Sequence, residues 1–297
     1  MSVEQERTPA SQRAVEIALI AVNYNSERAT AQLLADAMGQ STQNCKLSVV
    51  IADNGPTVTE LDGLREKYHH HPAVRFVRMP RNLGYFGAAH HALQTVFGHD
   101  LPDWIIVSNA DVRLIQKDLF DRLARKAVGP GAIAPRIISG RTGLDQNPFH
   151  RLRPSALRML LNRIIPRFSF LYWLLNMQFA IRRGVQRIVS TQNPEPLPHS
   201  TRIYAPHGAF IIFANKYFEC GGDLNVGAFL FAEEKFVAET CRRLGLDVFY
   251  DPSLEVFHDE HIATAHSPDI RRFQISASDY IYREFFTRSR QQVRHRC

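Results

Sequence analysis

Short apolar runs alternate with helix-length segments over the first half of this 297-residue chain, and this alternation restricts the folds open to it. Apolar runs bounded by turn residues predict buried strands, and the longer segments between them predict helices. Strands that alternate with helices are typical of βαβ units, so we expect a mostly parallel, right-handed wound sheet flanked by helices. The predicted strands are 15–22, 47–52, 74–78 and 104–108, and the predicted helices are 28–38, 61–68, 88–97 and 119–127.

The alternation becomes irregular after residue 134. We interpret the chain as one α/β domain over 15–268, preceded by a flexible tail (1–14) and followed by a basic, helical tail (269–297). A segment rich in arginine, 146–194, interrupts the domain as a helical insertion. The further predicted elements are short strands at 132–134, 247–250 and 254–257, a long strand at 202–213, and helices at 216–220, 233–244 and 270–294.

Cysteine spacing and hydropathy indicate the compartment. The four cysteines are far apart and form no C-x-x-C pair, which favours neither a zinc site nor a disulfide framework. The first 13 residues lack the apolar stretch of a secretory signal, and the chain has no apolar run of about 18 residues that could span a bilayer. We therefore expect a cytoplasmic protein.

The positive charge of the chain is local. The formal net charge is +7, and the stretch 146–194 carries eight arginines and no acidic residue, so the rest of the chain is nearly neutral. Such a segment indicates contact with something anionic. The arginines are Arg151, Arg153, Arg158, Arg163, Arg167, Arg182, Arg183 and Arg187.

Polar side chains follow three of the predicted strands at the points where these strands end. The carboxyl ends of parallel strands share one edge of a sheet, so these side chains can line one pocket. The Asp53 carboxylate can accept from a base N–H or a ribose hydroxyl, and Asp111 beside Asn109 offers oxygen ligands to Mg²⁺ or Mn²⁺. Taken alone, each acid is equally well explained as a helix N-cap or a turn residue. The polar tips are Asn23-Tyr24-Asn25, Asp53-Asn54 and Asn109-Ala110-Asp111.

Six motifs in a fixed order, spread over residues 15–260, resemble those of family 2 glycosyltransferases with the A-type fold, in the branch that includes rhamnosyltransferase-like enzymes. Each motif alone is weak, whereas the ordered set is specific. The motifs are Asn23-Tyr24-Asn25 after the first strand, Ala52-Asp53-Asn54-Gly55, Arg81 to Ala89, Ser108-Asn109-Ala110-Asp111-Val112, His207-Gly208-Ala209-Phe210 and Phe229 to Glu234.

This resemblance implies a single Rossmann-like domain with a nucleotide-binding half (15–135) and an acceptor half (200–262). The implied donor is a nucleotide-diphosphate sugar. Asp53 would read the base, and Asp111 would hold Mg²⁺ or Mn²⁺ as the last acid of a D-x-D-type motif whose first position is Asn109 here. The donor-binding residues carried over by the resemblance are Asn23, Tyr24, Asn25, Asp53, Asn82, Gly84, Asn109 and Gly208.

The acid pair of the family falls on Glu233 and Glu234. Glu234 is the expected general base, which takes the proton of the acceptor hydroxyl as it attacks the anomeric carbon. Adjacent like charges favour a raised pKa for one of the two, although an acidic first helical turn explains the pair as well. His258 matches a histidine that completes the metal site in relatives, and a packed or surface histidine is the alternative. Phe236 stands where the family often has a further acid.

The insertion combines arginines with large apolar side chains between 157 and 179. Basic helices with aromatic anchors bind anionic bilayer surfaces, where each nearby arginine contributes roughly 1 kcal/mol. A peripheral contact of residues 151–187 with the inner face of the cytoplasmic membrane would suit a lipid-linked acceptor. An acceptor lid and a homo-oligomer interface are equally good alternatives, and no nucleic-acid motif accompanies the arginines.

The function expected from the sequence is inverting transfer of a sugar from a UDP- or dTDP-sugar, with dTDP-rhamnose as one candidate, to a glycan or lipid-linked glycan in cell-envelope polysaccharide biosynthesis. Two alternatives remain. A nucleotidyltransferase would use a similar sheet and acidic site, but it would need a glycine-rich, basic phosphate loop that Asn23-Tyr24-Asn25 does not provide. A non-catalytic binding module with the same fold would explain Asn109 and Phe236.

Overall fold

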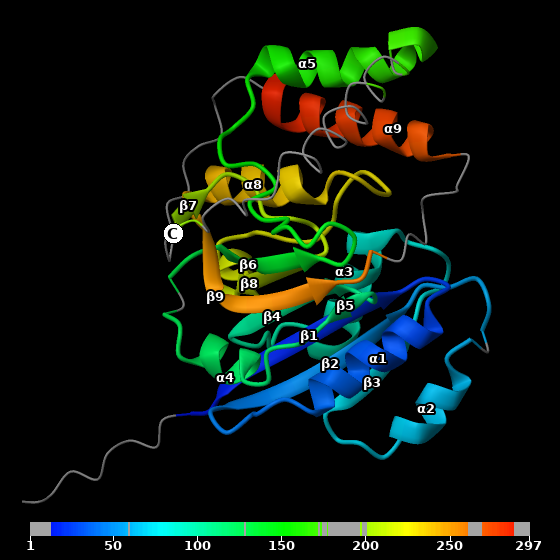
Figure 1. Cartoon of the computed structure of the whole chain (residues 1–297), viewed down its shortest axis with the longest axis vertical. Coiled ribbons are helices and arrows are strands. Elements are labelled where there is room, and N and C mark those ends of the chain that lie inside the picture. Colours follow the sequence, from blue (N-terminus) through cyan, green and yellow to red (C-terminus); the bar gives the residue numbers. More distant parts are fainter. Residues whose placement is uncertain are drawn as a thin grey trace, which may run out of the picture.

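The computed structural model describes residues 13–58, 60–127, 129–171, 173, 177, 197, 201–260 and 269–287. A nine-stranded sheet runs through the middle of the molecule, with helices on both faces (Figure 1). The strand order is β3-β2-β1-β4-β8-β6-β9-β5, and β7 pairs with β9. The predicted α/β class, with a mostly parallel central sheet flanked by helices, is confirmed.

The first half of the sheet is parallel and is built from the strands that the apolar runs predict. These are β1 (Val15–Asn23), β2 (Cys45–Asp53), β3 (Val74–Arg78) and β4 (Trp104–Asn109). The connecting helices are α1 (Glu27–Met38), α2 (Asp62–Tyr68) and α3 (Tyr85–Phe97), and α4 (Leu119–Ala124) follows the two-residue strand β5 (Val112–Arg113). Helix α3 begins three residues before its predicted start, because Gly84 takes a left-handed φ of 75° and turns the chain into the helix.

The second half of the sheet mixes directions. Strand β8 (Phe210–Ala214) is antiparallel to β4 and to β6 (Ala132–Ser139), and β9 (Val248–His258) is parallel to β6. Strands β5 and β7 (Thr201–Ile203) are antiparallel to β9. One edge of the sheet therefore collects several strand ends. These are the carboxyl ends of β1, β2, β4, β6 and β9 and the amino end of β8.

Three predictions for this half are wrong. The expected long strand 202–213 is two strands, β7 and β8, because Pro206 and the turn that follows it interrupt the run. The two short strands expected around Pro252 are one strand, β9, which passes the proline where the register with β6 shifts. Cys220 is disulfide-bonded, contrary to the expected absence of disulfides, whereas Cys45 and Cys241 are free and buried.

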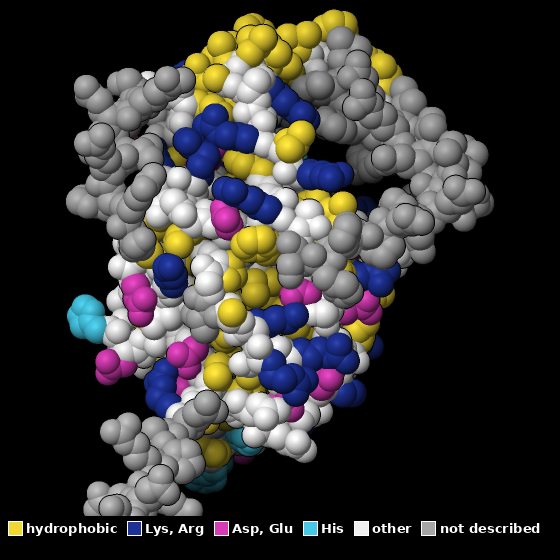
Figure 2. Space-filling view, turned by 90° about the vertical axis from the view of Figure 1, so that its left-hand side faces the viewer, with side chains coloured by type: hydrophobic (Ala, Val, Ile, Leu, Met, Phe, Trp, Pro, Cys, Tyr) yellow, Lys and Arg dark blue, Asp and Glu magenta, His cyan; other side chains and the backbone are white. Residues whose placement is uncertain are grey.

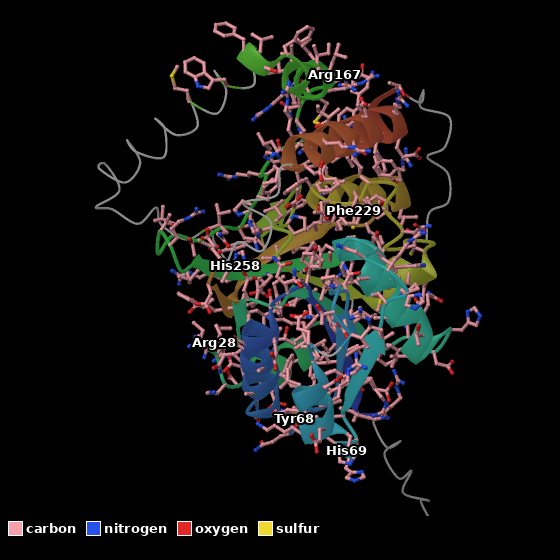
Figure 3. The ribbon with its side chains drawn as sticks, turned by 90° about the vertical axis from the view of Figure 1, so that its right-hand side faces the viewer. Arg28, Tyr68, His69, Arg167, Phe229 and His258 are labelled. Carbon is pink, nitrogen blue, oxygen red and sulfur yellow. The ribbon has the colours of Figure 1, made fainter. Side chains whose placement is uncertain are left out.

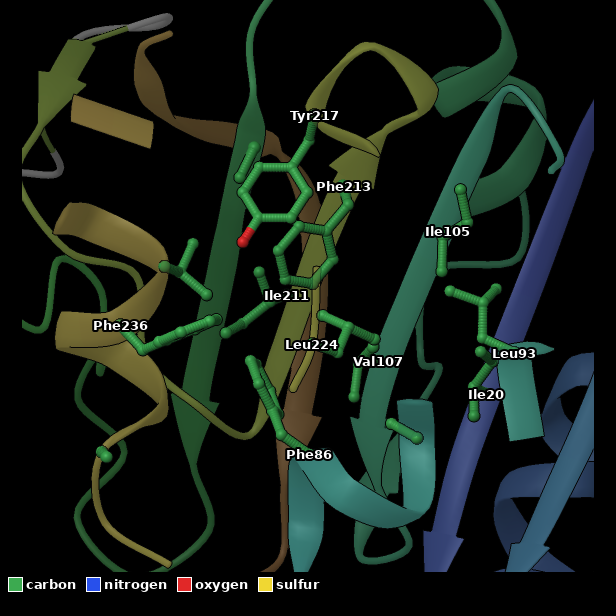
Figure 4. Close-up of a cluster of buried hydrophobic side chains, with 14 of the residues drawn as sticks. Ile20, Phe86, Leu93, Ile105, Val107, Ile211, Phe213, Tyr217, Leu224 and Phe236 are labelled. Carbon is green, nitrogen blue, oxygen red and sulfur yellow. The ribbon is translucent and has the colours of Figure 1, made fainter. Parts of the chain in front are cut away.

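The apolar core lies on both faces of the sheet. On one face α1, α2 and α4 cover β1, β2 and β4, and Trp104 and Phe120 are completely buried there. On the other face α3 and α8 (Glu233–Leu244) pack on the strands. Figure 4 shows this second face, where the Phe86 ring of α3 packs edge-on against Phe213 of β8, with a centroid separation of 6.3 Å. A core of this kind fixes the strand ends, and so the site, rigidly.

A further helical layer lies outside α8. Helix α5 (Ala156–Ile164), with the 3₁₀ turn Ile165–Arg167, packs on α9 (Ile270–Tyr282), whose chain continues as the π-turn Arg283–Thr287 (Figure 1). The short helix α7 (Asn215–Glu219) follows β8. Of the described helices, none is both long and apolar enough to cross a membrane. Part of the predicted insertion and of the C-terminal tail, including Arg182, Arg183 and Arg187, lies outside the described residues.

Candidate functional site

The polar tips predicted from the sequence share one edge of the sheet. Asn23 at the end of β1 is in register with Asp53 at the end of β2, and Val22 is in register with Asn109 at the end of β4. The amide of Asn109 donates to the carbonyl of Ala209, which brings the amino end of β8 to the same place. Parallel strands thus collect these side chains as the sequence analysis expects.

At the β1–β2 side of this edge, Asp53 is buried and its carboxylate is fully paired. One oxygen accepts from the Arg65 guanidinium at 2.5 Å and the other from Arg78 at 2.9 Å. Asn23 is also buried, and its side-chain Nδ2 has no hydrogen-bond partner among the described residues. A buried donor without a partner is costly, so Asn23 is a candidate ligand contact. Because both carboxylate oxygens of Asp53 are paired, a ligand at this place would contact the two arginines rather than Asp53 itself.

Asn54 ties the glycine-rich loop to the end of β2. Its side-chain oxygen accepts from the Leu83 amide, and its Nδ2 donates to Asn82 Oδ1 at 2.8 Å and to the Gly84 carbonyl at 3.2 Å. A Cβ on Gly84 would fall inside contact distance of the Phe229 carbonyl, in the loop before α8. Only glycine meets both requirements, the positive φ and the close approach. Asn54, which the sequence places among the polar strand ends but not among the donor-binding residues, is therefore a positioning residue.

Asp111 and His258 face each other across the β5–β9 pairing. Val112 is in register with His258, and the Asp259 amide donates to the Asp111 carbonyl. The His258 Nε2 lies 3.3 Å from Asp111 Oδ1, and its Nδ1 lies 2.8 Å from Gln146 Oε1. The Gln146 amide oxygen lies beside Nδ1, so Nε2 is the ring nitrogen that faces the Asp111 carboxylate. A carboxylate oxygen and an imidazole nitrogen that face each other are two of the ligand types that a divalent cation takes.

Glu233 and Glu234 open α8, at the positive end of its helix dipole. Glu233 is buried, and burial together with the Glu234 charge raises its pKa to about 8. Glu234 is half-buried beside Gly208, whose backbone hydrogen-bonds to its carboxylate, and burial raises the pKa of Glu234 as well. Phe231 precedes the pair with a left-handed φ of 69°, a strained conformation of the kind found at functional sites. A carboxyl with a raised pKa is suited to take up a proton.

Tyr85 connects these two acidic groups, and the sequence analysis missed it. Its hydroxyl is buried and has no hydrogen-bond partner among the described residues. After burial, the charges of Glu233, Asp111 and Glu234 each raise the pKa of Tyr85, so its hydroxyl lies within the electrostatic influence of all three carboxylates. A tyrosine at the first position of a helix looks in the sequence like a packing residue, so no sequence signal marks it.

A row of rings leads from His258 toward the surface. The rings of His258 and His207 are 5.9 Å apart, and those of His207 and Phe149 are 6.0 Å apart. The Asn147 side chain accepts from the His207 amide, which fixes this segment beside the site. Burial, followed by the charge of His258, lowers the pKa of His207 to about 4, so its ring is neutral near pH 7.

The structure thus brings most of the predicted site residues to one edge of the sheet. Asn23, Asp53, Asn109, Asp111 and His258 lie at or directly after strand ends, and Gly208 contacts Glu234. Tyr24 is half-buried, whereas Asn25 and Asn82 are exposed at the rim. Figure 3 marks Phe229 and His258 in the middle of the molecule, between the ends marked by Arg167 and Tyr68.

The sequence profile of glycosyl transferase family 2 matches residues 18–187, more than half of the chain. The chain belongs to glycosyl transferase family 2. This match confirms the family named from the motifs, and it does not address the rhamnosyltransferase-like branch. No curated protein sequence matches the chain significantly.

Solved structures of two glycosyltransferases share the fold. One is GalNAc-T7 with UDP, GalNAc and Mn²⁺, with a TM-score of 0.55 and 12% identity over 84% of this chain. The other is the mannosyltransferase PcManGT of Pyrobaculum calidifontis with GDP-Man and Mn²⁺, with a TM-score of 0.51 and 17% identity over 90% of this chain. The chain spans 44% of the first protein and 69% of the second. At these identities the likeness supports the A-type glycosyltransferase fold.

Proposed function

We propose that this protein is an inverting glycosyltransferase that moves a sugar from a nucleotide-diphosphate sugar to a hydroxyl of a glycan or lipid-linked glycan. The observation that carries the proposal is that the buried, unpaired hydroxyl of Tyr85 lies within the electrostatic influence of Asp111, Glu233 and Glu234 together. An acid next to a histidine at the strand ends, and a second acid with a raised pKa, are the two parts that such a transfer needs.

Glu234 is the proposed general base. Its raised pKa lets it accept the proton of the acceptor hydroxyl as that oxygen attacks the anomeric carbon from the side opposite the diphosphate. A single displacement of this kind inverts the anomeric centre. The loop 82–84 and the strand-end residue Asn23 are proposed to hold the donor, with Asp53 and its two arginines at the base.

Asp111 and His258 fit a divalent cation, with the diphosphate supplying the remaining oxygen ligands. Among the described residues no cluster of three or more acidic, histidine or cysteine side chains forms a complete cation site by itself. The Asp111 carboxylate and His258 Nε2 nevertheless face each other, and Gln146 lies beside the other ring nitrogen. Mg²⁺ or Mn²⁺ bound there would neutralise charge on the departing diphosphate. Both structural neighbours were solved with Mn²⁺.

Calorimetric titration with UDP, dTDP and GDP, with and without Mn²⁺, tests the proposal. We expect one nucleotide to bind in a metal-dependent way, and Asp111→Asn to lose this dependence. The preferred nucleotide narrows the donor to its sugar conjugates, including dTDP-rhamnose if dTDP binds. Nucleotide binding without sugar transfer to any acceptor would instead favour a non-catalytic binding module.

We also propose that α5 contacts the anionic inner surface of the cytoplasmic membrane, where a lipid-linked acceptor would be reached. Four side chains on one side of the α5 segment are exposed, namely Leu157, Leu161, Ile164 and Phe168. Figure 2 shows hydrophobic side chains gathered at the end of the molecule where Figure 1 places α5. An apolar stripe beside arginines is suited to the headgroup region of a bilayer. A homo-oligomer through the same stripe is the alternative that the flotation experiment below addresses.

A further inference from the structure

Unpaired polar atoms gather around the turn that ends β2. Six buried side-chain nitrogen or oxygen atoms of the described residues have no hydrogen-bond partner, and half of them belong to residues beside the turn Asp53-Asn54-Gly55. A buried polar atom without a partner is costly, so several around one turn indicate that a ligand completes the arrangement. The three atoms are the donors Asn23 Nδ2 and Arg65 Nε and the acceptor Glu60 Oε2.

The two donors are fixed beside this turn by their other contacts. Asn23 is in register with Asp53, and its carbonyl accepts from the Asn54 amide at 3.0 Å. Its side-chain oxygen accepts from the amide of Ser26, so the unpaired end of this side chain is the amino group. Arg65 donates through Nη2 to Asp53 Oδ2 at 2.5 Å, which leaves its Nε unpaired.

Glu60, rather than Asp53, offers the acceptor in this region. A Cβ atom placed on Gly55 would lie 2.5 Å from Glu60 Oε2 and 3.7 Å from Asp53 Oδ1, so both carboxylates approach the same point. The two oxygens of Asp53 are paired with Arg65 and Arg78, whereas Glu60 forms no ion pair with the described residues. An ionised carboxylate accepts hydrogen bonds and donates none. The ligand atom that faces Glu60 Oε2 must therefore be a donor.

The strand order gives the distance of this region from the proposed cation site. Strand β1 lies between β2 and β4, so the ends of β2 and β4 are two strand spacings apart, roughly 10 Å. A diphosphate beside Asp111, just after β4, leaves this length for the nucleoside, which would pass Asn23 and reach the end of β2. The unpaired carboxylate of Glu60 repels phosphate, so the uncharged base is the part of the donor that suits this end.

We propose that Glu60 reads the nucleobase of the donor by accepting from its ring N–H, while a carbonyl oxygen beside this N–H accepts from Arg65. This inference rests on the proposed glycosyl transfer and specifies its donor. Uracil, thymine and guanine each carry a ring N–H next to a carbonyl group. Cytosine and adenine present a ring nitrogen lone pair at the same edge, which would face the carboxylate with no proton between them. Glu60 thus selects the first three bases against the last two.

Calorimetric titration of the full chain in Mn²⁺ with two pairs of nucleotides tests this. UDP and CDP differ at the base edge that carries either the N–H or the lone pair, and GDP and ADP differ at the corresponding edge. We expect the N–H member of the preferred pair to bind at least tenfold more tightly, because a site built to accept a hydrogen bond rejects a base that cannot donate it. Tighter binding of UDP and dTDP assigns the N–H to a pyrimidine, and tighter binding of GDP assigns it to guanine.

A methylated nucleotide provides a test that needs no variant. N3-methyl-UDP or N1-methyl-GDP, whichever matches the preferred base, lacks only the proposed donor hydrogen and carries a methyl group in its place. It should bind the wild-type chain at least tenfold more weakly than its parent nucleotide. Equal binding of the methylated and parent nucleotides overturns the inference.

A carboxylate-to-amide change assigns the selectivity to Glu60. An amide can donate as well as accept, so Glu60→Gln should lower the UDP-to-CDP or GDP-to-ADP affinity ratio about tenfold. Glu66→Gln, which changes an exposed carboxylate on the same helix, α2, should leave the ratio unchanged. An unchanged ratio in Glu60→Gln, or an equal loss for both members of the pair as a ribose contact would give, overturns the inference and leaves the proposed function intact. A folded chain that binds no nucleotide at all overturns both.

Discussion

At the scale of single residues, the site is defined by polar atoms that the fold buries and leaves unpaired. Tyr85 Oη, on the first residue of α3, and Asn23 Nδ2, at the end of β1, are such atoms. Proteins rarely retain such groups without use, because each costs about 1–3 kcal/mol. Trp104 Nε1, at the opposite end of β4, is unpaired as well, so an unpaired atom points to a ligand contact only where other site residues lie beside it.

Tyr85→Phe should separate activity from stability. Removing an unpaired hydroxyl leaves no new unsatisfied partner, so the free energy of unfolding should not fall, while sugar transfer should slow at least tenfold as about 1.4 kcal/mol of contact is lost. Tyr217→Phe is the matched control. Its buried hydroxyl donates to the Asp223 carbonyl at 2.9 Å, so that variant should lose about 1 kcal/mol of stability and keep its activity. The opposite pattern in urea unfolding and initial-rate measurements would mean that Tyr85 is a packing residue.

Gly84→Ala should damage the donor loop by more than backbone strain accounts for. Gly84 and Gly143 both have positive φ, 75° and 69°, but only at Gly84 does an added Cβ meet the Phe229 carbonyl. Gly143→Ala should cost about 1–2 kcal/mol, the strain of a left-handed alanine. Gly84→Ala should cost more and also weaken nucleotide binding. Equal losses of stability in the two variants, with nucleotide binding intact, would show that the Phe229 contact is unimportant.

At the scale of elements, the arginine-rich insertion divides into an attached side and a free side. Arg163 and Arg167 attach the α5 segment to Asp279, and Arg153 stacks on the Phe286 ring as well as pairing with Glu239. The sequence analysis treated the arginines as one device for binding an anion. Among the described residues, three of these arginines form ion pairs within the molecule, so the charge of those three is already neutralised. Exposed leucines on α5 are therefore better targets than arginines for testing membrane contact.

The double variant Leu157→Gln, Leu161→Gln should reduce flotation with anionic liposomes several-fold. These side chains are 65% and 45% exposed, so folding should change by less than about 1 kcal/mol, while each loses apolar area that a bilayer would bury. Ile115→Gln, which removes a 47% exposed apolar side chain outside α5, is the control. If the double variant floats as well as the control and the wild type, the stripe does not bind membrane. A lower mass of the double variant in light scattering would then assign the stripe to an oligomer interface.

At the scale of the whole molecule, the candidate site lowers the stability of the fold. Glu233 is buried at a position where its ordinary pKa of 4.5 rises to about 8. The unfolded chain therefore ionises this group at a lower pH than the folded chain, and stability falls as the pH rises from about 4.5 to about 8. A carboxyl group at this position therefore lowers the free energy of unfolding above about pH 4.5, a loss of the kind common at functional sites.

Glu233→Gln should remove this pH dependence. The variant should gain stability relative to the wild type as the pH increases, with the largest difference at pH 8 and above and the smallest near pH 4.5. Urea unfolding of both proteins between pH 4.5 and 9 measures the difference. A constant difference over that range would show that the pKa of Glu233 is not raised. Sugar-transfer rates measured on both proteins would show whether the stabilised variant is less active.

The sheet and most strand ends could be predicted because buried parallel strands produce apolar runs that stop at polar residues. Other features depend on distant pairings that no local pattern contains. The proximity of Asp111 and His258 depends on the two-residue strand β5, and the pairing of Asp53 with Arg65 and Arg78 depends on where α2 and β3 lie. The break between β7 and β8 was missed because apolar residues continue on both sides of Pro206. Tyr85 could not be found, since only the fold leaves its hydroxyl unpaired.

The contacts of Gln146 with His258 and of Asn147 with His207 have a practical consequence for protein engineering. These two residues begin the segment that the sequence pattern assigns to an insertion, yet their side chains contact His258 and His207 beside the candidate site. An exchange of this segment between family members, made to alter the acceptor or the membrane contact, should therefore begin after His150. An exchange that begins at residue 146 would change the exchanged surface and the orientation of the histidines together. The cause of any altered specificity could then not be assigned to one of the two.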